Sequence, residues 1–483
     1  MCCPIQSLCW LDDRHLSSDR AGQLMVVGEV AGRADVVVIG AGPGGYVAAL
    51  RCADLLDVAS SGKRVVLIER DAIGGVCLNV GCIPSKVLIH TAEVAHLATR
   101  SAGWGVDLTA TIDMTRVHEH RRATIAQLTG GVTMLLDRAG VERWAGSARF
   151  SKPDRLAVVS GDEVRHLEFA HCIIATGSRP TKLTGLPLDG DRIVDSTGAL
   201  EFPEVPPTLL VVGGGYIGIE LGTAWAKLGA DVTIVEGADR ILPNMERRLS
   251  VEVQRSLDRL GVTTVVGTFV SGVDDPLVVD ADRVIVAVGR TPNTDDLGLS
   301  TAKISVDPAG LIPVGADRRA TRTVFAIGDV TAGPALAHKA SAEAEVAARA
   351  IAGQSAAFDP ACLPEVVFSD PEIASVGHTV ESAAAEGVRA TSFRFPLAAG
   401  SRSRTIGDST GFVQLVSDEA GTIIGAQMAG DGVAELIGEV ALAIEMGMVA
   451  EEIASTIHPH PTRSEAIVEA AHGLLGRPLH VRR

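Results

Sequence analysis

Two glycine-rich turns, each set between a short apolar strand and a helical pattern, constrain the fold of this chain more than any other feature. In the first, "DVVVIGAGPGGYVAALRCADLL", residues 36–39 lead into Gly40, Gly42 and Gly45, and the next strand, "RVVLIE", ends in Glu69. In such a βαβ unit the glycines allow a tight turn and close backbone approach, and the helix N-terminus offers free N–H groups to a pyrophosphate. The terminal acid binds the ribose hydroxyls, so the pattern predicts a dinucleotide-binding domain.

The same arrangement returns in "TLLVVGGGYIGIELGTAWAKLGADVTIVE", with Gly213, Gly215 and Gly218 in the turn and Glu236 at the end of the second strand. The carboxylate of Glu236 would repel a 2′-phosphate, so this second site is expected to prefer NAD(H) to NADP(H). Two dinucleotide sites in one chain imply that electrons pass between two cofactors. The predicted fold class is therefore α/β, with two Rossmann-like domains.

Length, charge and hydropathy narrow the class further. A chain of 483 residues is too long for one hydrophobic core and indicates several domains. The formal net charge of −16 argues against nucleic acid or an anionic membrane as the main partner. Apolar runs such as "ADVVVIGAG" end at glycines, far short of the roughly 20 residues that span a bilayer. A globular protein without a nucleic-acid or membrane partner is expected.

Cysteine usage and the first residues bear on the compartment. The eight cysteines are irregularly spaced, unlike the disulfide framework of a small secreted protein, so a reducing cytoplasm is expected. The first 24 residues lack the apolar segment of a signal peptide and carry acids that a mitochondrial transit peptide avoids. We expect residues 1–24 to be a disordered extension or to precede the true start at Met25.

Two cysteines five positions apart, Cys77 and Cys82, lie in the segment "GGVCLNVGCIPSK". They are compatible with a structural crosslink, half of a metal site or a redox device. In a regular helix their Cα atoms would be about 8.6 Å apart. A disulfide bridges at most about 7 Å, so a bond between them requires a distorted helix start near Gly81. A crosslink this short restricts little chain entropy, and a zinc site would need two further ligands, for which "HPHP" (458–461) is available.

Combined with the two glycine-rich units, this segment resembles the pyridine nucleotide-disulphide oxidoreductases and, among them, the dihydrolipoyl dehydrogenases. The resemblance extends from about Asp35 to His472. It includes the motifs "ATGSRP" (175–180), "AVGRTPNT" (287–294), "FAIGDV" (325–330), "LAHKA" (336–340), "VVFSDPEIASVG" (366–377) and "HPHPTRSE" (458–465). Several independent motifs in the same order make a chance similarity untenable.

The resemblance implies that FAD occupies the first dinucleotide site and NAD the second. The residues implied for FAD are Gly40, Gly42, Gly45, Glu69, Lys86, Ala148, Thr176, Gly177, Ser178, Asp329, Ala335, Leu336, Ala337 and His338. Those implied for NAD are Gly213, Gly215, Gly218, Glu220, Glu236 and Gly289. No metal is implied.

The catalytic roles also come from the resemblance. Cys77 and Cys82 would form a redox-active disulfide, with Cys77 the more exposed sulfur attacked by substrate and Cys82 facing the flavin. His460, oriented by Glu465 and supplied by the partner subunit, would be the catalytic base. Lys86 would lie near the flavin and pair with Glu220. The implied reaction is flavin-dependent oxidation of protein-bound dihydrolipoamide to lipoamide, with reduction of NAD⁺ to NADH.

The implied layout has an extension (1–32), an FAD-binding domain (33–178), an NAD-binding domain (179–289), a central segment completing the FAD domain (290–359) and an α+β dimerisation domain (360–483). In the last domain, "GFVQLVSDEAGTIIGAQMAG" is typical of an antiparallel sheet and "ELIGEVALAIEMGM" of a covering helix. A homodimer is expected. Its expected partners are the lipoyl domains of 2-oxo acid dehydrogenase complexes or the lipoyl carrier protein of glycine cleavage.

One departure and several alternatives remain. Between Gly261 and Val284 the chain lacks about a hairpin's worth of sequence, so the antiparallel part of the second domain is expected to be short. Mercuric reductases carry a C-terminal cysteine pair, whereas no cysteine follows Cys362 here, and glutathione-type reductases favour NADP(H), which Glu236 disfavours. Another alternative is a flavin-binding assembly subunit without turnover.

Overall fold

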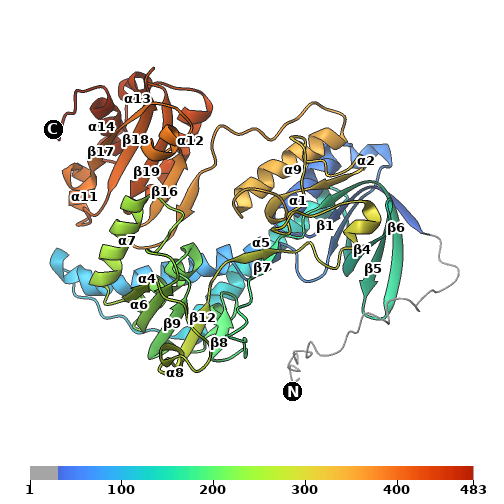
Figure 1. The fold of residues 1–483 in the computed structure, drawn as a ribbon, viewed down its shortest axis with the longest axis horizontal. Helices are drawn as coiled ribbons and strands as arrows, with labels where there is room; N and C mark the ends of the chain where they lie inside the picture. Colours follow the sequence, from blue (N-terminus) through green and yellow to red (C-terminus); the bar gives the residue numbers. More distant parts are fainter. Residues whose placement is uncertain (1–30, 482–483) are drawn as a thin grey trace.

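A computed structural model describes residues 31–481, which contain three main sheets formed in turn along the chain (Figure 1). The predicted extension, residues 1–24, lies outside the described residues. Within the described part, no helix combines the length and apolar character needed to cross a membrane. The division into the five ranges given above stays a prediction, while the sheets themselves are now visible.

The first glycine-rich turn belongs to a seven-stranded sheet of order β3-β2-β1-β6-β5-β4, in which β14 also pairs with β6. Residues 36–39 of β1 are buried on both faces, as a central parallel strand between β2 and β6 requires. Helix α1 (Pro43–Leu55) follows directly. The strands are β1 (Gly32–Ile39), β2 (Val65–Glu69), β3 (Glu142–Ala145), β4 (Ser147–Lys152), β5 (Arg155–Ser160), β6 (Glu163–Ile174) and β14 (Val324–Ala326).

The second turn belongs to a five-stranded sheet of order β11-β10-β9-β12-β8. Every described pair in it is parallel, and between β11 and β12 the structure has only the short helix α8 (Pro276–Val279), so the expected shortening is confirmed. The strands are β8 (Ile193–Asp195), β9 (Thr208–Val212), β10 (Asp231–Glu236), β11 (Thr263–Val266) and β12 (Arg283–Val286), and the helices α6 (Tyr216–Leu228) and α7 (Arg247–Arg259).

The third sheet is antiparallel, as the alternating pattern predicts, with order β15-β16-β19-β18-β17. Helices α12 (Val433–Glu445) and α14 (Glu465–Leu474) share one apolar core with it, because Val440 and Ile467 pack in the same cluster as Val413. The strands are β15 (Glu365–Val367), β16 (Ile373–Gly377), β17 (Ala390–Pro396), β18 (Phe412–Asp418) and β19 (Ile423–Ala429).

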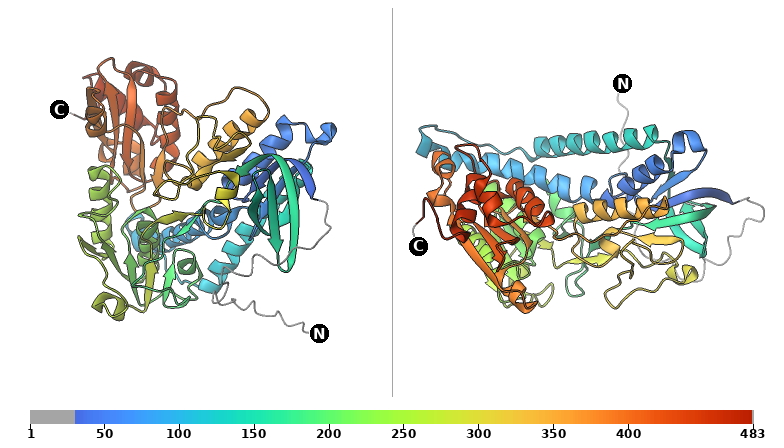
Figure 2. Two further views of the ribbon diagram at one scale, coloured as in Figure 1. Left: turned by 45° about the vertical axis from the view of Figure 1, so that its right-hand side comes forward. Right: turned by 90° about the horizontal axis from the view of Figure 1, so that it is seen from above.

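The three parts meet at helix α4 (Cys82–Arg100), which packs against α6 and, with α5 (Met114–Arg138), extends along the molecule in the right-hand view of Figure 2. Two ion pairs join α4 to α6, about two helical turns apart. In one pair α4 supplies the lysine, and in the other α6 supplies it. Lys86 pairs with Glu220 at 2.7 Å, and Glu93 pairs with Lys227. Because the pairs follow the same order on both helices, they fix one register, and a slip of seven residues would place like charges together.

Each of these pairs is completed by the third part of the chain. The backbone N–H of Phe368 donates to Glu220 Oε1 at 3.0 Å, and Asp370 Oδ2 lies 2.5 Å from Lys227 Nζ. The Glu220 and Lys227 side chains are almost fully buried. Residues 368–370 therefore tie the third part to both ion pairs.

Candidate active site

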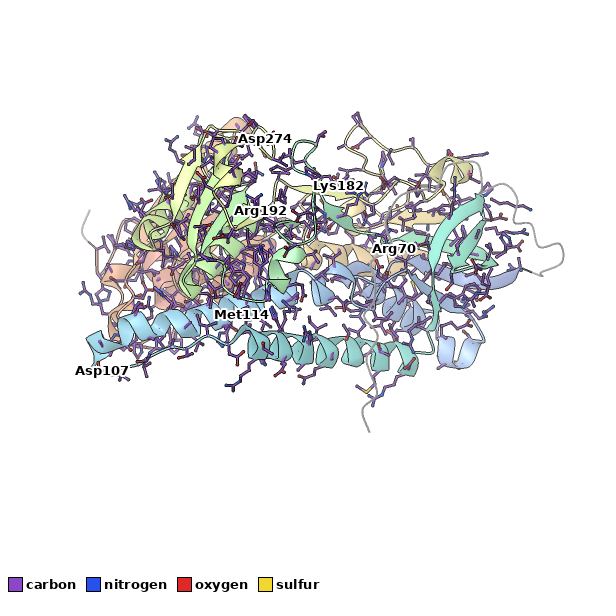
Figure 3. The ribbon with its side chains drawn as sticks, turned by 90° about the horizontal axis from the view of Figure 1, so that it is seen from below. Arg70, Asp107, Met114, Lys182, Arg192 and Asp274 are labelled. Atoms are coloured by element: carbon purple, nitrogen blue, oxygen red, sulfur yellow. The ribbon has the colours of Figure 1, made fainter. Side chains whose placement is uncertain are left out.

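A cavity of about 890 Å³ lies between the first sheet, α4 and the start of α6. It is lined by residues of both glycine-rich units together with both cysteines of the "GGVCLNVGCIPSK" segment. Arg70 and Lys182, two basic residues of its wall, are labelled in Figure 3. Its volume is in the upper range for a ligand site that encloses a large organic molecule. Of the predicted FAD residues it brings together Gly40, Gly42, Glu69, Lys86, Ala148, Thr176, Gly177, Ser178, Asp329, Ala335 and Ala337.

The first glycine-rich turn has the geometry of a phosphate cradle. Gly40 has φ +99°, and a Cβ on Gly45 would overlap the Gly40 carbonyl oxygen, so neither position accepts another residue. At Gly42 an added Cβ would meet nothing within 4 Å, and the residue lines the cavity at the N-terminus of α1. The Glu69 carboxylate accepts from Ala41 N at 2.6 Å and from Asp71 N at 2.9 Å, which holds it at the mouth of the turn.

The second turn repeats this geometry. Gly213 has φ +113°, a Cβ on Gly218 would overlap the Gly213 carbonyl oxygen, and the space beside Gly215 is open. Glu236 accepts from Gly214 N at 2.7 Å and from Ala238 N at 2.8 Å, the counterparts of the two bonds to Glu69. This second cradle lies outside the cavity lining, and the two are joined through α6, whose Glu220 reaches the cavity wall.

The cysteine pair lies where the chain breaks between two helices. Helix α3 (Gly75–Asn79) carries Cys77, and α4 begins at Cys82. The break falls at Gly81, as predicted. Glycine suits this position because an added Cβ would lie only 3.0 Å from the Val76 carbonyl oxygen. Both cysteines are free thiols that line the cavity. Cys82 opens toward the cavity, and Cys77 is partly buried because α3 packs it against the apolar core around β1; which sulfur the substrate attacks stays a prediction.

The two thiols interact with each other, and this interaction separates their acidities. A hydrogen bond between them is the largest cause, raising the pKa of Cys77 well above its usual value and lowering the pKa of Cys82 to about 7. The ammonium of Lys86 further favours the Cys82 thiolate, against the opposing effect of burial. Cys82 is therefore the sulfur that carries the negative charge near neutral pH.

Lys86 is held in place by two contacts from two distant parts of the chain. It extends from α4, four residues after Cys82, and donates to Glu220 Oε2 at 2.7 Å. Its ammonium also lies 4.7 Å from the centroid of the Phe368 ring, a cation–π distance. Phe368 was missed in the sequence, although it lies within the "VVFSDPEIASVG" motif. These contacts keep a positive charge beside the thiolate.

His460 and Glu465 form a pair at the start of α14. His460 Nδ1 lies 2.8 Å from Glu465 Oε1, so Nδ1–H donates to the carboxylate and Nε2 is left as the basic nitrogen. Burial would raise the pKa of Glu465, but hydrogen bonds from His460 and from Thr462 N outweigh it and the pKa lies below its usual value. His460 is exposed and is not among the residues that line the cavity of its own chain.

Comparison with known proteins places these features in one family. Residues 34–344 match the family model described as pyridine nucleotide-disulphide oxidoreductase, and residues 363–471 match the model of the dimerisation domain of these proteins. The chain belongs to the pyridine nucleotide-disulphide oxidoreductase family. It is 46% identical to a dihydrolipoyl dehydrogenase of Geobacillus stearothermophilus over 95% of this chain and 99% of that protein. It is 43% identical to a dihydrolipoyl dehydrogenase of Halobacterium salinarum over 94% of this chain and 99% of that one.

Solved structures of the family agree. The crystal structure of LpdA from Mycobacterium tuberculosis matches with a TM-score of 0.85 at 26% identity, covering 92% of this chain and all of that one. The disulfide reductase RclA from Escherichia coli matches with a TM-score of 0.80 at 26% identity, covering 91% and 99%. The predicted fold class, two Rossmann-like domains with a C-terminal dimerisation domain, is thereby confirmed.

The two cradles fit the dinucleotides that this oxidoreductase family uses, FAD and NAD. The cavity begins at the open side of Gly42 and ends at the cysteine pair, and Asp329 enters it through a hydrogen bond with Ser178 Oγ at 2.5 Å. Three predicted FAD residues, Gly45, Leu336 and His338, are not in its lining. His338 instead donates through Nε2 to the Pro364 carbonyl at 2.9 Å. Arg290, which donates to Ser178 Oγ at 2.7 Å, was missed because the contact spans more than a hundred residues.

The acidity of Cys82 leads to a first prediction. In reduced protein, alkylation of Cys82 by iodoacetamide should rise with pH through a midpoint near 7, since only the thiolate reacts and is lost as pH falls below this pKa. Lys86→Met should move the midpoint upward. Peptide mapping by mass spectrometry measures each site. Cys362, whose pKa is raised by burial and by Glu445, is the control and should react slowly at pH 7; a Cys82 midpoint near 9 would contradict the assignment.

Asp329 is positioned by a buried charge cluster behind it. Glu343, fully buried, accepts from Gly328 N at 2.6 Å and from Arg318 at 2.9 Å, and lies 3.2 Å from Lys339 Nζ. The carboxylate thus balances the buried Lys339 and the partly buried Arg318 while fixing the residue before Asp329. This cluster was also missed, because Glu343 has no signature beyond a helical acid.

Glu343→Gln should destabilise the protein by about 3 kcal/mol, since removing the carboxylate leaves the buried Lys339 and the partly buried Arg318 unbalanced. We also expect FAD to dissociate at a lower temperature, which flavin fluorescence during heating measures. Glu345→Gln is the matched control on the same helix, because Glu345 is partly exposed and its ion pairs with Arg51 and Arg349 contribute little. Equal flavin release by the two variants would show that Glu343 does not position Asp329.

Proposed function

We propose that this protein oxidises protein-bound dihydrolipoamide to lipoamide and reduces NAD⁺ to NADH. The observation that carries the proposal is the Cys77–Cys82 pair in the cavity wall, with the negative charge directed to Cys82 by the hydrogen bond from Cys77 and then by Lys86. Relatives that share 42–46% of their sequence over nearly the whole chain are dihydrolipoyl dehydrogenases. The catalytic residues proposed are Cys77, Cys82, His460, Glu465, Lys86 and Glu220.

In the first step, the oxidised pair carries a Cys77–Cys82 disulfide. His460 Nε2 takes a proton from one substrate thiol, and the resulting thiolate attacks Cys77 Sγ. The disulfide breaks and Cys82 leaves as a thiolate. A sulfur of lower pKa leaves faster, and the Lys86 ammonium beside Cys82 favours its thiolate, which supports Cys82 as the leaving group.

In the second step, the other substrate thiol loses its proton and attacks the substrate sulfur bound to Cys77. Lipoamide leaves as a closed disulfide, and Cys77 departs with the electron pair and takes up a proton. Two electrons and two protons have then moved from the substrate to the protein. Bound FAD supplies the route by which the electron pair passes from the cysteine pair to NAD⁺. Lys86 offsets the charge of the Cys82 thiolate throughout.

We propose a homodimer in which the cavity of one chain is completed by His460 of the partner subunit. Two observations support it: residues 363–471 match a dimerisation-domain model, and His460 lies outside the cavity lining of its own chain. In Figure 1, α14, which His460 closely precedes, lies far from α1 at the other end of the molecule. We further propose the cytoplasm as the compartment, and lipoyl domains or the glycine-cleavage carrier as the substrates.

Anaerobic addition of dihydrolipoamide to the purified protein, followed by NAD⁺, tests the function. We expect a long-wavelength absorption band from a thiolate beside oxidised flavin, discharged by NAD⁺ with formation of NADH. Flavin that does not respond to the dithiol would exclude the lipoamide assignment. Turnover of glutathione disulfide or Hg²⁺ with NADPH instead would favour the corresponding reductase.

A further inference from the structure

An aromatic side chain is exposed beside the second cradle and has no role in the chemistry above. Phe269 follows β11, and 82% of its surface is exposed. The other exposed aromatic residues of the described chain, Trp104 and Tyr216, show only 46% and 42%. A single exposed apolar side chain needs no explanation by itself; the position of this one, beside the second cradle, carries the argument.

The ring is fixed at the end of β10 that carries Glu236. Thr268 N donates to the Glu236 carbonyl at 3.1 Å, and Gly267 N donates to the Ala238 carbonyl at 2.7 Å. A Cβ added to Gly237 would lie 2.5 Å from the Phe269 ring, so the ring rests directly on this glycine. Phe269 therefore stands next to the acid that binds the ribose, at the carboxyl edge of the sheet where dinucleotides bind.

The first domain has an equivalent of Phe269 beside its own glycine-rich turn. There β2 pairs with β3 so that Glu69 is opposite Ala145, and in the second domain Glu236 is opposite Val266. Counting three residues onward, Phe269 corresponds to Ala148, which lines the FAD cavity. The internal repeat thus puts Phe269 at a position that faces a dinucleotide.

We infer that the Phe269 ring stacks on the adenine of NAD and forms one wall of the adenine subsite. The adenine is attached to the same ribose that Glu236 binds, so it lies within reach of the ring. Aromatic stacking accepts the flat face of a purine without hydrogen bonds. The segment 267–282, which contains Asp274 (Figure 3), carries no antiparallel strands. The Phe269 ring on Gly237 therefore supplies an apolar surface for the adenine that this short segment does not otherwise provide. The inference rests on the proposed NAD site.

Binding of AMP and of ADP-ribose to the oxidised holoenzyme, measured by calorimetry, tests it. Phe269→Ala should weaken both by about tenfold, the lower end of what loss of one base–aromatic stack costs. Phe269→Tyr should bind as the wild type does. In turnover, kcat/KM for NAD⁺ should fall by the same factor, with KM for dihydrolipoamide unchanged.

Val279→Ala is the matched control. Val279 is an exposed residue of the same shortened segment, but its carbonyl contacts Arg192, which precedes β8 at the opposite edge of the sheet. Unchanged AMP affinity in Phe269→Ala, equal losses in Val279→Ala or Phe269→Tyr, or a wild type that does not bind AMP would each overturn the inference. If AMP binding depends on Phe269 while dihydrolipoamide is not oxidised, the adenine subsite stands and the proposed substrate fails.

Discussion

Cys82→Ser should lower the turnover of dihydrolipoamide with NAD⁺ by roughly four orders of magnitude, as loss of a covalent catalytic group does. A serine oxygen cannot form the disulfide that accepts the electron pair, so no electrons leave the substrate. The long-wavelength band should be absent when the dithiol is added. Stopped-flow absorption under anaerobic conditions measures both effects.

Cys77→Ser separates the roles of the two sulfurs. It should be equally inactive, but it keeps the thiolate at Cys82 and should therefore show the long-wavelength band without any substrate above about pH 7. Cys362→Ser, a free cysteine outside the cavity, should turn over normally and is the control. If the band persisted in Cys82→Ser and vanished in Cys77→Ser, the two sulfurs would have to exchange roles.

His460→Gln should lower dihydrolipoamide oxidation by about a thousandfold, within the range for loss of a general base. Reduction of an artificial electron acceptor by NADH should be unaffected, because it requires no proton from a dithiol. His480→Gln is a close control: His480 is similarly exposed and its Nδ1 lies 2.6 Å from Glu469 Oε1. Loss of both activities in His460→Gln would indicate a structural role.

The same variant tests the shared site. When inactive Cys82→Ser and His460→Gln subunits are unfolded and reassembled together, half of the dimers are mixed, and each mixed dimer has one complete site. About a quarter of the wild-type activity should therefore return. No recovery would place His460 and the cysteine pair of one site in the same chain.

The parts of the site that obey local rules could be predicted from the sequence. Gly40 and Gly213 have positive φ, and Gly45 and Gly218 lie against the carbonyl oxygen of a residue five positions earlier. A few neighbouring residues are therefore enough to explain why each position is glycine. The break at Gly81 is of the same kind. The antiparallel third sheet could also be predicted, because its strands are close together in the sequence and their apolar and polar residues alternate.

Contacts between distant segments could not be read in this way. Glu343, Arg290 and Phe368 act through partners that only the folded chain brings near, and none has an unusual neighbourhood in the sequence. The packing of Cys77 could not be read for the same reason: the apolar core that partly covers it is built from other segments. Phe269 escaped notice because a single aromatic residue after a strand is ordinary until its solvent exposure is known.

The alternating ion pairs between α4 and α6 have a consequence for motion. A rotation of the NAD-binding part away from the FAD-binding part would break both ion pairs, Lys86–Glu220 and Lys227–Glu93, at the same time. It would also break the contacts of Glu220 and Lys227 with residues 368–370. Because Glu220 and Lys227 are almost fully buried, leaving either without its partner is unfavourable, and the two parts are expected to stay closed. The two nucleotide-binding parts therefore keep one arrangement, and access of the nicotinamide to the flavin site depends on rotation of individual side chains.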